Sequence, residues 1–102
     1  GFVLHTDNYL LSPNSEYKAT MQSDGNFVVT NSEGIVIWNS QKFPGEGYIT
    51  MQLDGNLVAY LKSDNSPYWA SMTSGDNLTL CLGNDGILTI SDDNNTIYWK
   101  SQ

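Results

Sequence analysis

The sequence is poor in the residues that cross-link chains or perform catalysis. Its 102 residues include one cysteine, Cys81, and one histidine, His5. A single cysteine cannot form a disulfide within the chain, so packing must stabilise the fold. We expect Cys81, between Leu80 and Leu82, to be a small buried residue, with an intermolecular disulfide or a reactive thiol as alternatives. Cys81 and His5 lie far apart in sequence and supply too few ligands for zinc, so neither a Cys-His nucleophile nor a zinc site is expected.

Positive charge is also scarce. Four Lys and Arg residues stand against eleven Asp and Glu residues, a formal net charge of −7. Such a balance opposes binding to phosphate backbones and anionic lipids, so we expect no nucleic acid partner and no membrane insertion. No apolar run approaches the ~18 residues of a transmembrane helix, and no signal peptide is recognisable at the start. The expectation is a soluble chain, and the sequence leaves extracellular and cytoplasmic locations open.

Amphipathic helical spacing is absent as well, and the apolar pattern has a period of two. β-branched and aromatic residues alternate with clusters of Gly, Asn, Asp, Ser and Pro, which is typical of strands and turns. The turn-forming clusters are NSEG (31–34), SDNSP (63–67) and SDDNN (91–95), with PGEG (44–47) and SGDN (74–77) between them. The pattern predicts an all-β fold in which hairpins are joined by short crossings.

Three internal repeats of about 31 residues fill nearly the whole chain. They begin MQSDGNFVVT at Met21, MQLDGNLVAY at Met51 and LGNDGILTIS at Leu82, and each ends in a Trp-x-Ser sequence. A single repeat is too small to bury its own apolar face, so the three must share one core. We therefore predict a single domain over residues 1–102.

The shared core is predicted from residues that recur at equivalent positions. Trp38, Trp69 and Trp99 should meet near a pseudo-threefold axis, because each can bury on the order of 200 Å². The apolar residues expected to point to the same core are Met51, Leu53, Leu57 and Ala59 of the second repeat and Met21, Phe27 and Val29 of the first. The recurring glycines Gly25, Gly55 and Gly86 indicate a tight bulge or a close backbone approach within a strand.

The opposite face of the second repeat carries polar residues at every second position. If residues 51–60 form one strand, a row roughly 27 Å long at ~3.3 Å per residue contains Gln52, Asp54, Asn56, Val58 and Tyr60. Amide, carboxylate and hydroxyl groups around one small apolar side chain suit a polyhydroxylated ligand. The alternative is the solvated face of a half-exposed sheet. Asn and Asp are poor strand formers, and their recurrence in the first repeat as Gln22, Asp24, Asn26 and Val28 favours a ligand site.

No catalytic or metal-binding constellation accompanies this row. Glycoside hydrolysis needs two carboxylates facing one bond, and the row has one. No nucleophile with a nearby base, phosphate loop or metal cluster is recognisable. The Asp24-Gly25 and Asp54-Gly55 pairs do not continue into the spaced acidic ligands of a calcium loop. We expect a protein that is not an enzyme and that needs no cofactor or metal.

The QxDxNxVxY row, repeated and followed by Trp-x-Ser, resembles the monocot mannose-binding lectins, also called bulb-type lectins. The resemblance covers essentially the whole chain. It implies a β-prism II fold of three four-stranded antiparallel sheets, with one potential mannose site per sheet and no metal. In that family the Gln, Asp and Asn side chains bind the O2 and O3 hydroxyls of mannose, the Tyr hydroxyl binds O4, and the Val packs on ring carbons.

The resemblance differs from repeat to repeat. The second repeat has the full set and is the predicted site. In the first repeat Thr30 replaces the tyrosine, and the loss of one neutral hydrogen bond, about 0.5–1.5 kcal/mol, predicts a site roughly two- to tenfold weaker. The third repeat has Gly83, Asp85, Ile87, Thr89 and Ser91 at these positions, so only the aspartate remains and no binding is expected.

The implied ligands are mannose and high-mannose glycans, because single shallow sites commonly reach only millimolar affinity and gain from multivalency. The resemblance also suggests a homodimer made by exchange of C-terminal strands. The expected partner of the strand holding Tyr98 and Trp99 is the N-terminal segment near Asp7 and Asn8, an arrangement that permits either closure within the chain or exchange between chains. The alternative function is a protein-interaction or defence module with degenerate sugar sites.

Overall fold

The computed structural model describes residues 2–102, and their regular secondary structure consists of short strands. The strands are β1 (Val3–Leu4), β2 (Tyr9–Leu11), β3 (Lys18–Met21), β4 (Phe27–Thr30), β5 (Val36–Asn39), β6 (Gly47–Met51), β7 (Leu57–Leu61), β8 (Pro67–Ala70), β9 (Thr79–Leu82), β10 (Leu88–Ser91) and β11 (Ile97–Lys100). These residues include no helix that could cross a membrane.

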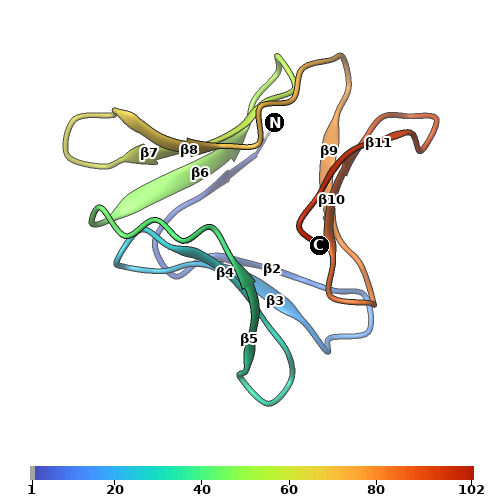
Figure 1. Ribbon diagram of the computed structural model, residues 1–102, viewed down its shortest axis with the longest axis horizontal. Helices are drawn as coiled ribbons and strands as arrows, with labels where there is room; N and C mark the ends of the chain where they lie inside the picture. The colour runs from blue at the N-terminus through green and yellow to red at the C-terminus, as the bar shows by residue number, and fades with distance from the viewer. Residues whose placement is uncertain (1) are drawn as a thin grey trace.

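The strands form three antiparallel sheets that make the three sides of a prism (Figure 1). The sheets have the orders β2-β3-β4-β5, β1-β6-β7-β8 and β11-β10-β9. The all-β, β-prism II prediction is therefore confirmed. The strand count differs in the third sheet, which has three strands instead of four, because within residues 2–102 no strand pairs with the outer edge of β9.

The predicted turns at 31–34, 63–67 and 91–95 join β4 to β5, β7 to β8 and β10 to β11, as expected. The prediction of one continuous strand over residues 51–60 is wrong. Residues 52–56 form a turn between β6 and β7, in which the Gln52 N–H donates to the Asn56 carbonyl at 2.9 Å and the Gly55 N–H to the Gln52 carbonyl at 3.0 Å. The Asp, Gly and Asn residues that made this segment a poor strand are the residues that turns select.

Gly55 occupies this turn for two reasons. Its φ of +91° lies in the left-handed region that glycine tolerates best, and a Cβ atom there would lie 2.5 Å from the backbone nitrogen of Gly75. At Gly86 the nearest atoms belong to the side chains of Ile37 and Tyr17, but at Gly55 the predicted close backbone approach is confirmed. It occurs in a turn, however, and not within a strand.

The core lies on the axis where the inner faces of the three sheets meet. The rings of Trp38, Trp69 and Trp99 pack edge to face around it, with centroid separations of 6.1 Å, 5.7 Å and 5.8 Å. This confirms the predicted tryptophan cluster. The buried residues around it include Met21, Phe27, Val29, Met51, Leu57 and Ala59, all predicted.

Two burial predictions are wrong. Leu53 is 87% exposed, because it lies at the tip of the 52–56 turn and not on the inner face of a strand. Cys81 is also exposed. Its neighbours Leu80 and Leu82 point into the core, so alternation along β9 turns the cysteine outwards.

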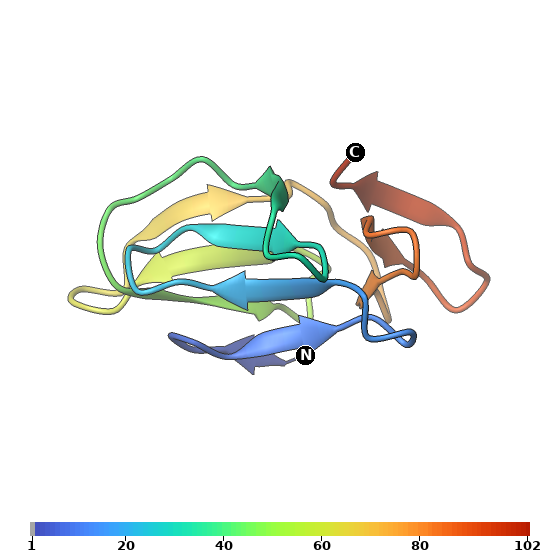
Figure 2. The same cartoon turned by 90° about the horizontal axis from the view of Figure 1, so that it is seen from below.

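The C-terminal strand pairs within its own sheet. β11 lies beside β10, with Trp99 opposite Ile90, and not beside the N-terminal segment near Asp7 and Asn8. In Figure 2 the N-terminal strands and the chain end lie on opposite rims of the molecule. The predicted partner of the Tyr98–Trp99 strand is therefore corrected to β10.

Candidate functional site

The five predicted residues of the second repeat lie on the hairpin of β6 and β7. Gln52, Asp54 and Asn56 are in the turn, and Val58 and Tyr60 follow on the outer face of β7. Because the chain folds back at residues 52–56, the polar groups do not form an extended row. They gather at the end of the hairpin, where Tyr60 and Gln52 reach each other directly.

Hydrogen bonds connect three of these side chains in a chain. The Tyr60 hydroxyl donates to Oε1 of Gln52, and the Gln52 amide donates to both carboxylate oxygens of Asp54 at 3.2 Å. The backbone N–H of Asn56 also donates to Asp54 Oδ1 at 2.9 Å. This N–H, followed by the Gln52 amide, lowers the pKa of Asp54 below its usual value of about 3.8. Asp54 is therefore a charged hydrogen-bond acceptor at neutral pH.

Asn56 presents one half of its amide to solvent. Its Oδ1 accepts from the backbone N–H of Met72 at 3.0 Å and from the Ser71 hydroxyl at 3.3 Å, so the oxygen holds the crossing after β8 against the turn. The Nδ2 group donates to no other residue in the described part of the chain. Its two hydrogens are available to a hydroxyl oxygen of a ligand.

Val58 forms the base of this region. It is buried but lies outside the central core cluster, on the outer face, where Thr50 and Ala70 are its cross-strand neighbours. Only 5% of its surface is exposed. The apolar contact that it can offer to a ligand is therefore small.

The first repeat has the same turn, but the side chain of its asparagine, Asn26, has different hydrogen-bond partners. Asp24 Oδ1 accepts from the Asn26 N–H at 2.9 Å, as Asp54 does from Asn56. The Asn26 amide, however, donates to Oδ1 of Asn39 at 3.3 Å, and Asn26 is buried. Asn39 is the cross-strand neighbour of Val28, in the place that Ala70 takes beside Val58.

These contacts leave the first repeat with fewer free groups than the second. Gln22 and Asp24 lie at the surface of the turn, and Thr30 ends β4 without the reach of a tyrosine. The Asn26 oxygen accepts from the Ser40 hydroxyl at 2.9 Å and from the Gln41 N–H at 3.1 Å. Asn26 thus uses both ends of its side-chain amide within the protein.

The third repeat retains only the turn. Asp85 Oδ1 accepts from the Ile87 N–H at 3.0 Å, and Gly83, Ile87, Thr89 and Ser91 supply no side-chain amide. The same aspartate contact therefore occurs in all three repeats. A structural role in the turn explains why the aspartate is present where the other polar residues are not.

Sequence reasoning missed two contributors to this geometry. The first is the middle residue of Trp-x-Ser, which is Asn39, Ala70 or Lys100 in the three repeats. The second is Tyr48, whose ring stacks on that of Tyr60 with a centroid separation of 5.4 Å. The variable middle residue was visible in the repeat alignment. Tyr48 could be placed only once β6 and β7 were known to pair.

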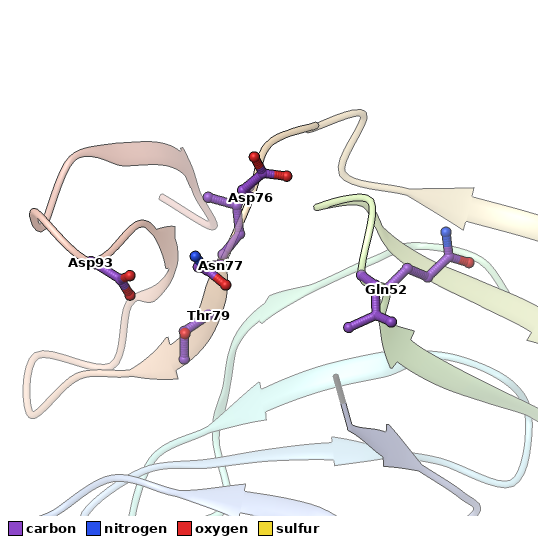
Figure 3. A pocket seen from close by; sticks show the side chains of 7 residues that line it. Gln52, Asp76, Asn77, Thr79 and Asp93 are labelled. Atoms are coloured by element: carbon purple, nitrogen blue, oxygen red, sulfur yellow. The ribbon is translucent and has the colours of Figure 1, made fainter.

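A cavity of about 620 Å³ adjoins this site and shares Gln52 with it. It lies between the 52–56 turn and the third sheet, where Asp76, Asn77 and Asp93 line it. Figure 3 shows the Gln52 side chain turned away from these residues. Among residues 2–102, no group of three or more His, Cys, Asp and Glu side chains is placed to hold a metal ion.

Comparison with known proteins identifies the family. No protein-family model matches the chain. The B-type lectin plumieribetin of Scorpaena plumieri is 32% identical over 102 residues, which cover 96% of this chain and 87% of that protein. Among solved structures, a monomeric monocot mannose-binding lectin from Gastrodia elata is 31% identical, with a TM-score of 0.86 over 99% of this chain and 91% of its own.

A second solved structure also aligns with nearly the whole chain. The Polygonatum cyrtonema lectin, solved in complex with a monomannoside, is 29% identical, with a TM-score of 0.79 over 96% of this chain and 87% of its own. Lectins bind carbohydrate without catalysis, in agreement with the expectation that the protein is not an enzyme. The chain belongs to the B-type lectin family.

Proposed function

We propose that this lectin binds mannose residues of glycans through one site, made by Gln52, Asp54, Asn56, Val58 and Tyr60. The observation that carries the proposal is the free Asn56 amide beside the charged Asp54, a combination that the first and third repeats do not offer. The mannoside complex of the Polygonatum relative supports mannose as the ligand. All three repeats act together as one lectin domain, because their sheets share the tryptophan cluster.

The site is arranged for neighbouring hydroxyls on one sugar ring. Asp54 accepts from one hydroxyl while the Asn56 amide donates to the same or the next oxygen. Tyr60 and Gln52 satisfy each other in the free protein, so a sugar hydroxyl must replace their mutual hydrogen bond. Because this exchange yields little net free energy, we expect millimolar affinity for a single mannose and stronger binding only to surfaces that present many.

The first repeat is proposed to be closed. Binding there would require the Asn26 amide to leave Asn39, and Thr30 offers no compensating contact. The expected stoichiometry is therefore one mannose per chain.

A titration with methyl α-mannoside, followed by amide chemical shifts, tests the proposal. Shifts should change at residues 52–60 and not at 22–30. Asn56→Asp keeps the oxygen that accepts from Met72 but removes the free donor, so binding should be lost while the fold is retained. The matched control is Asn94→Asp, the same change at an exposed turn of the third sheet. The absence of shifts at tens of millimolar mannoside would favour the protein-interaction alternative.

A homodimer by exchange of C-terminal strands is the proposed assembly. The unpaired outer edge of β9 supports a sheet that a strand of a second chain can join. Sedimentation at tens of micromolar should give twice the chain mass. A monomeric mass, as for the Gastrodia relative, would contradict it.

A further inference from the structure

The outer face of the sheet that carries the proposed site continues past Tyr60 as a row of rings. Tyr48 lies opposite Tyr60 across β6 and β7, and the two rings stack at an interplanar angle of 23°. His5, which follows β1, lies beyond Tyr48 with a centroid separation of 6.0 Å. The three rings cross the sheet and give it a continuous, partly apolar surface.

A depression of about 320 Å³ lies beside Tyr48. Its lining also includes Glu46, Lys62, His5, Thr6 and Asn65. Lys62 is four residues beyond Val58 along the chain, a span of about 13 Å at ~3.3 Å per residue. That span exceeds one sugar ring, so a ligand that fills both the proposed site and the depression must be an oligosaccharide.

The polar groups of the depression form hydrogen bonds with one another and with neighbouring side chains. Oε2 of Glu46 accepts from the Thr6 hydroxyl at 2.8 Å and pairs with the Lys62 ammonium at 3.4 Å. The Tyr48 hydroxyl donates to Oδ1 of Asn65 at 2.9 Å. The hydrogen bond from the Thr6 hydroxyl, followed by that from Lys62, lowers the pKa of Glu46, which keeps the carboxylate charged.

The charge of the depression indicates the kind of ligand. The charges of Glu46 and Lys62 oppose each other within one ion pair, and the chain as a whole carries −7. A neutral sugar meets no repulsion here, whereas an acidic sugar would. The Oε1 atom of Glu46 and the remaining ammonium hydrogens can accept from and donate to hydroxyls.

The other two sheets lack this arrangement. Strand register places Lys18 and Thr30 where the second sheet has Tyr48 and Tyr60, and Leu11 where it has His5. In the third sheet the equivalent pair is Thr79 and Ser91. The rings and the depression therefore occur on the one sheet that also retains the complete set of proposed mannose-binding residues.

From this coincidence we infer that the depression is a second sugar subsite, with Tyr48 as its platform and Glu46, Lys62 and Asn65 as its hydrogen-bonding groups. The inference rests on the proposed mannose site, which would hold the first residue of the glycan. The preferred ligand is then a neutral mannose oligosaccharide of two or three residues, and the second subsite distinguishes it from free mannose.

The test compares methyl α-mannoside with linear mannotriose by titration and chemical shifts. The wild-type protein should bind mannotriose roughly five- to thirtyfold more tightly, the gain of one or two net hydrogen bonds. Only mannotriose should shift the signals of Glu46 and Asn65, whereas Tyr48, which stacks on Tyr60, can respond to either ligand. Glu46→Ala and His5→Leu should remove the gain while leaving methyl mannoside binding within twofold. His5→Leu introduces the residue that the first sheet already uses at this position, Leu11.

The outcomes separate this inference from the proposed function. Glu33→Ala, which removes an exposed carboxylate from a turn of the first sheet, is the control and should change neither affinity. If both ligands bind with equal affinity, or if Glu46→Ala weakens both equally, the second subsite is refuted while the mannose site stands. If neither ligand binds, the proposed function itself fails, and the subsite with it.

Discussion

The side-chain amide of Asn26 donates to Oδ1 of Asn39 at 3.3 Å, whereas the second hairpin has Ala70 at the position of Asn39 and offers the Asn56 amide no such acceptor. This contact is the main difference between two hairpins whose turn geometry is otherwise the same. The contact occupies the side-chain nitrogen of Asn26, whereas the side-chain oxygen already accepts hydrogen bonds from Ser40 and Gln41. The occupancy of that nitrogen separates a closed site from an open one.

Opening the first hairpin should therefore create a second sugar site. Asn39→Ala frees the Asn26 amide, and Thr30→Tyr supplies the missing hydroxyl. We expect the double variant to bind two methyl α-mannosides per chain, with new chemical-shift changes at residues 22–30. The Thr30→Tyr variant alone should still bind one.

The reverse substitution should close the second hairpin. Ala70→Asn places an amide beside Val58, where it can accept from Asn56 as Asn39 does from Asn26. Mannoside affinity should fall at least tenfold with little change in thermal stability. Unchanged binding in this variant would show that Asn39 is not what closes the first site.

Tyr60→Phe tests the contribution of the tyrosine hydroxyl. The substitution removes one neutral hydrogen bond, so affinity for methyl α-mannoside should fall roughly two- to tenfold. Tyr98→Phe is the matched control, because the exposed Tyr98 hydroxyl bonds Asp92 on a different sheet. A loss beyond a hundredfold would instead indicate that Tyr60 positions Gln52, to which it donates in the free protein.

Much of this fold was predictable, because periodicity and repeats depend on local residue choice. The tryptophan cluster, the turns at 31–34, 63–67 and 91–95 and the shared core followed from repeat spacing and turn-forming residues. The third sheet's missing strand did not, since no sequence pattern marked the outer edge of β9 as unpaired.

The main error of the sequence-based prediction, one continuous strand over residues 51–60, has one physical cause. A two-residue period was extended through Asp54, Gly55 and Asn56, although these residues favour turns. Strand alternation then assigned Leu53 to the core, where the fold instead exposes it. The site residues themselves were placed together by the turn, and the blocking contact of Asn39 depended on a cross-strand pairing that sequence did not provide.

The pH dependence of binding should follow Asp54. Its pKa is lowered, so the charged form persists as pH falls and is lost only when pH drops through a value below about 3.8. Mannoside affinity should be constant from pH 8 to 5 and decline below pH 4. Asp54→Asn, which retains an Oδ1 acceptor for the turn, should bind weakly at every pH. A decline already complete at pH 5 would assign the titration to another group.

The free energy of unfolding should fall at alkaline pH because Tyr68, which connects the first two sheets, ionises. Its hydroxyl donates to the Gly25 carbonyl at 2.6 Å, which joins β8 to the turn of the first hairpin. Burial, followed by the nearby charge of Asp24, raises the pKa of Tyr68 to about 12. Because the folded pKa exceeds the usual value of about 10, the contribution to stability is complete below pH 10 and is lost as pH rises towards 12.

Tyr68→Phe removes the hydroxyl that donates to the Gly25 carbonyl. The free energy of unfolding, measured in urea at pH 7, should therefore fall by about 1–2 kcal/mol. Tyr9→Phe, at an exposed position, should leave stability unchanged. As pH rises from 10 towards 12 the wild-type protein increasingly loses the same hydrogen bond by ionisation, and the gap between it and Tyr68→Phe should narrow. A gap that stays constant from pH 7 to 12 would mean that packing of the ring, and not its hydroxyl, holds the two sheets together.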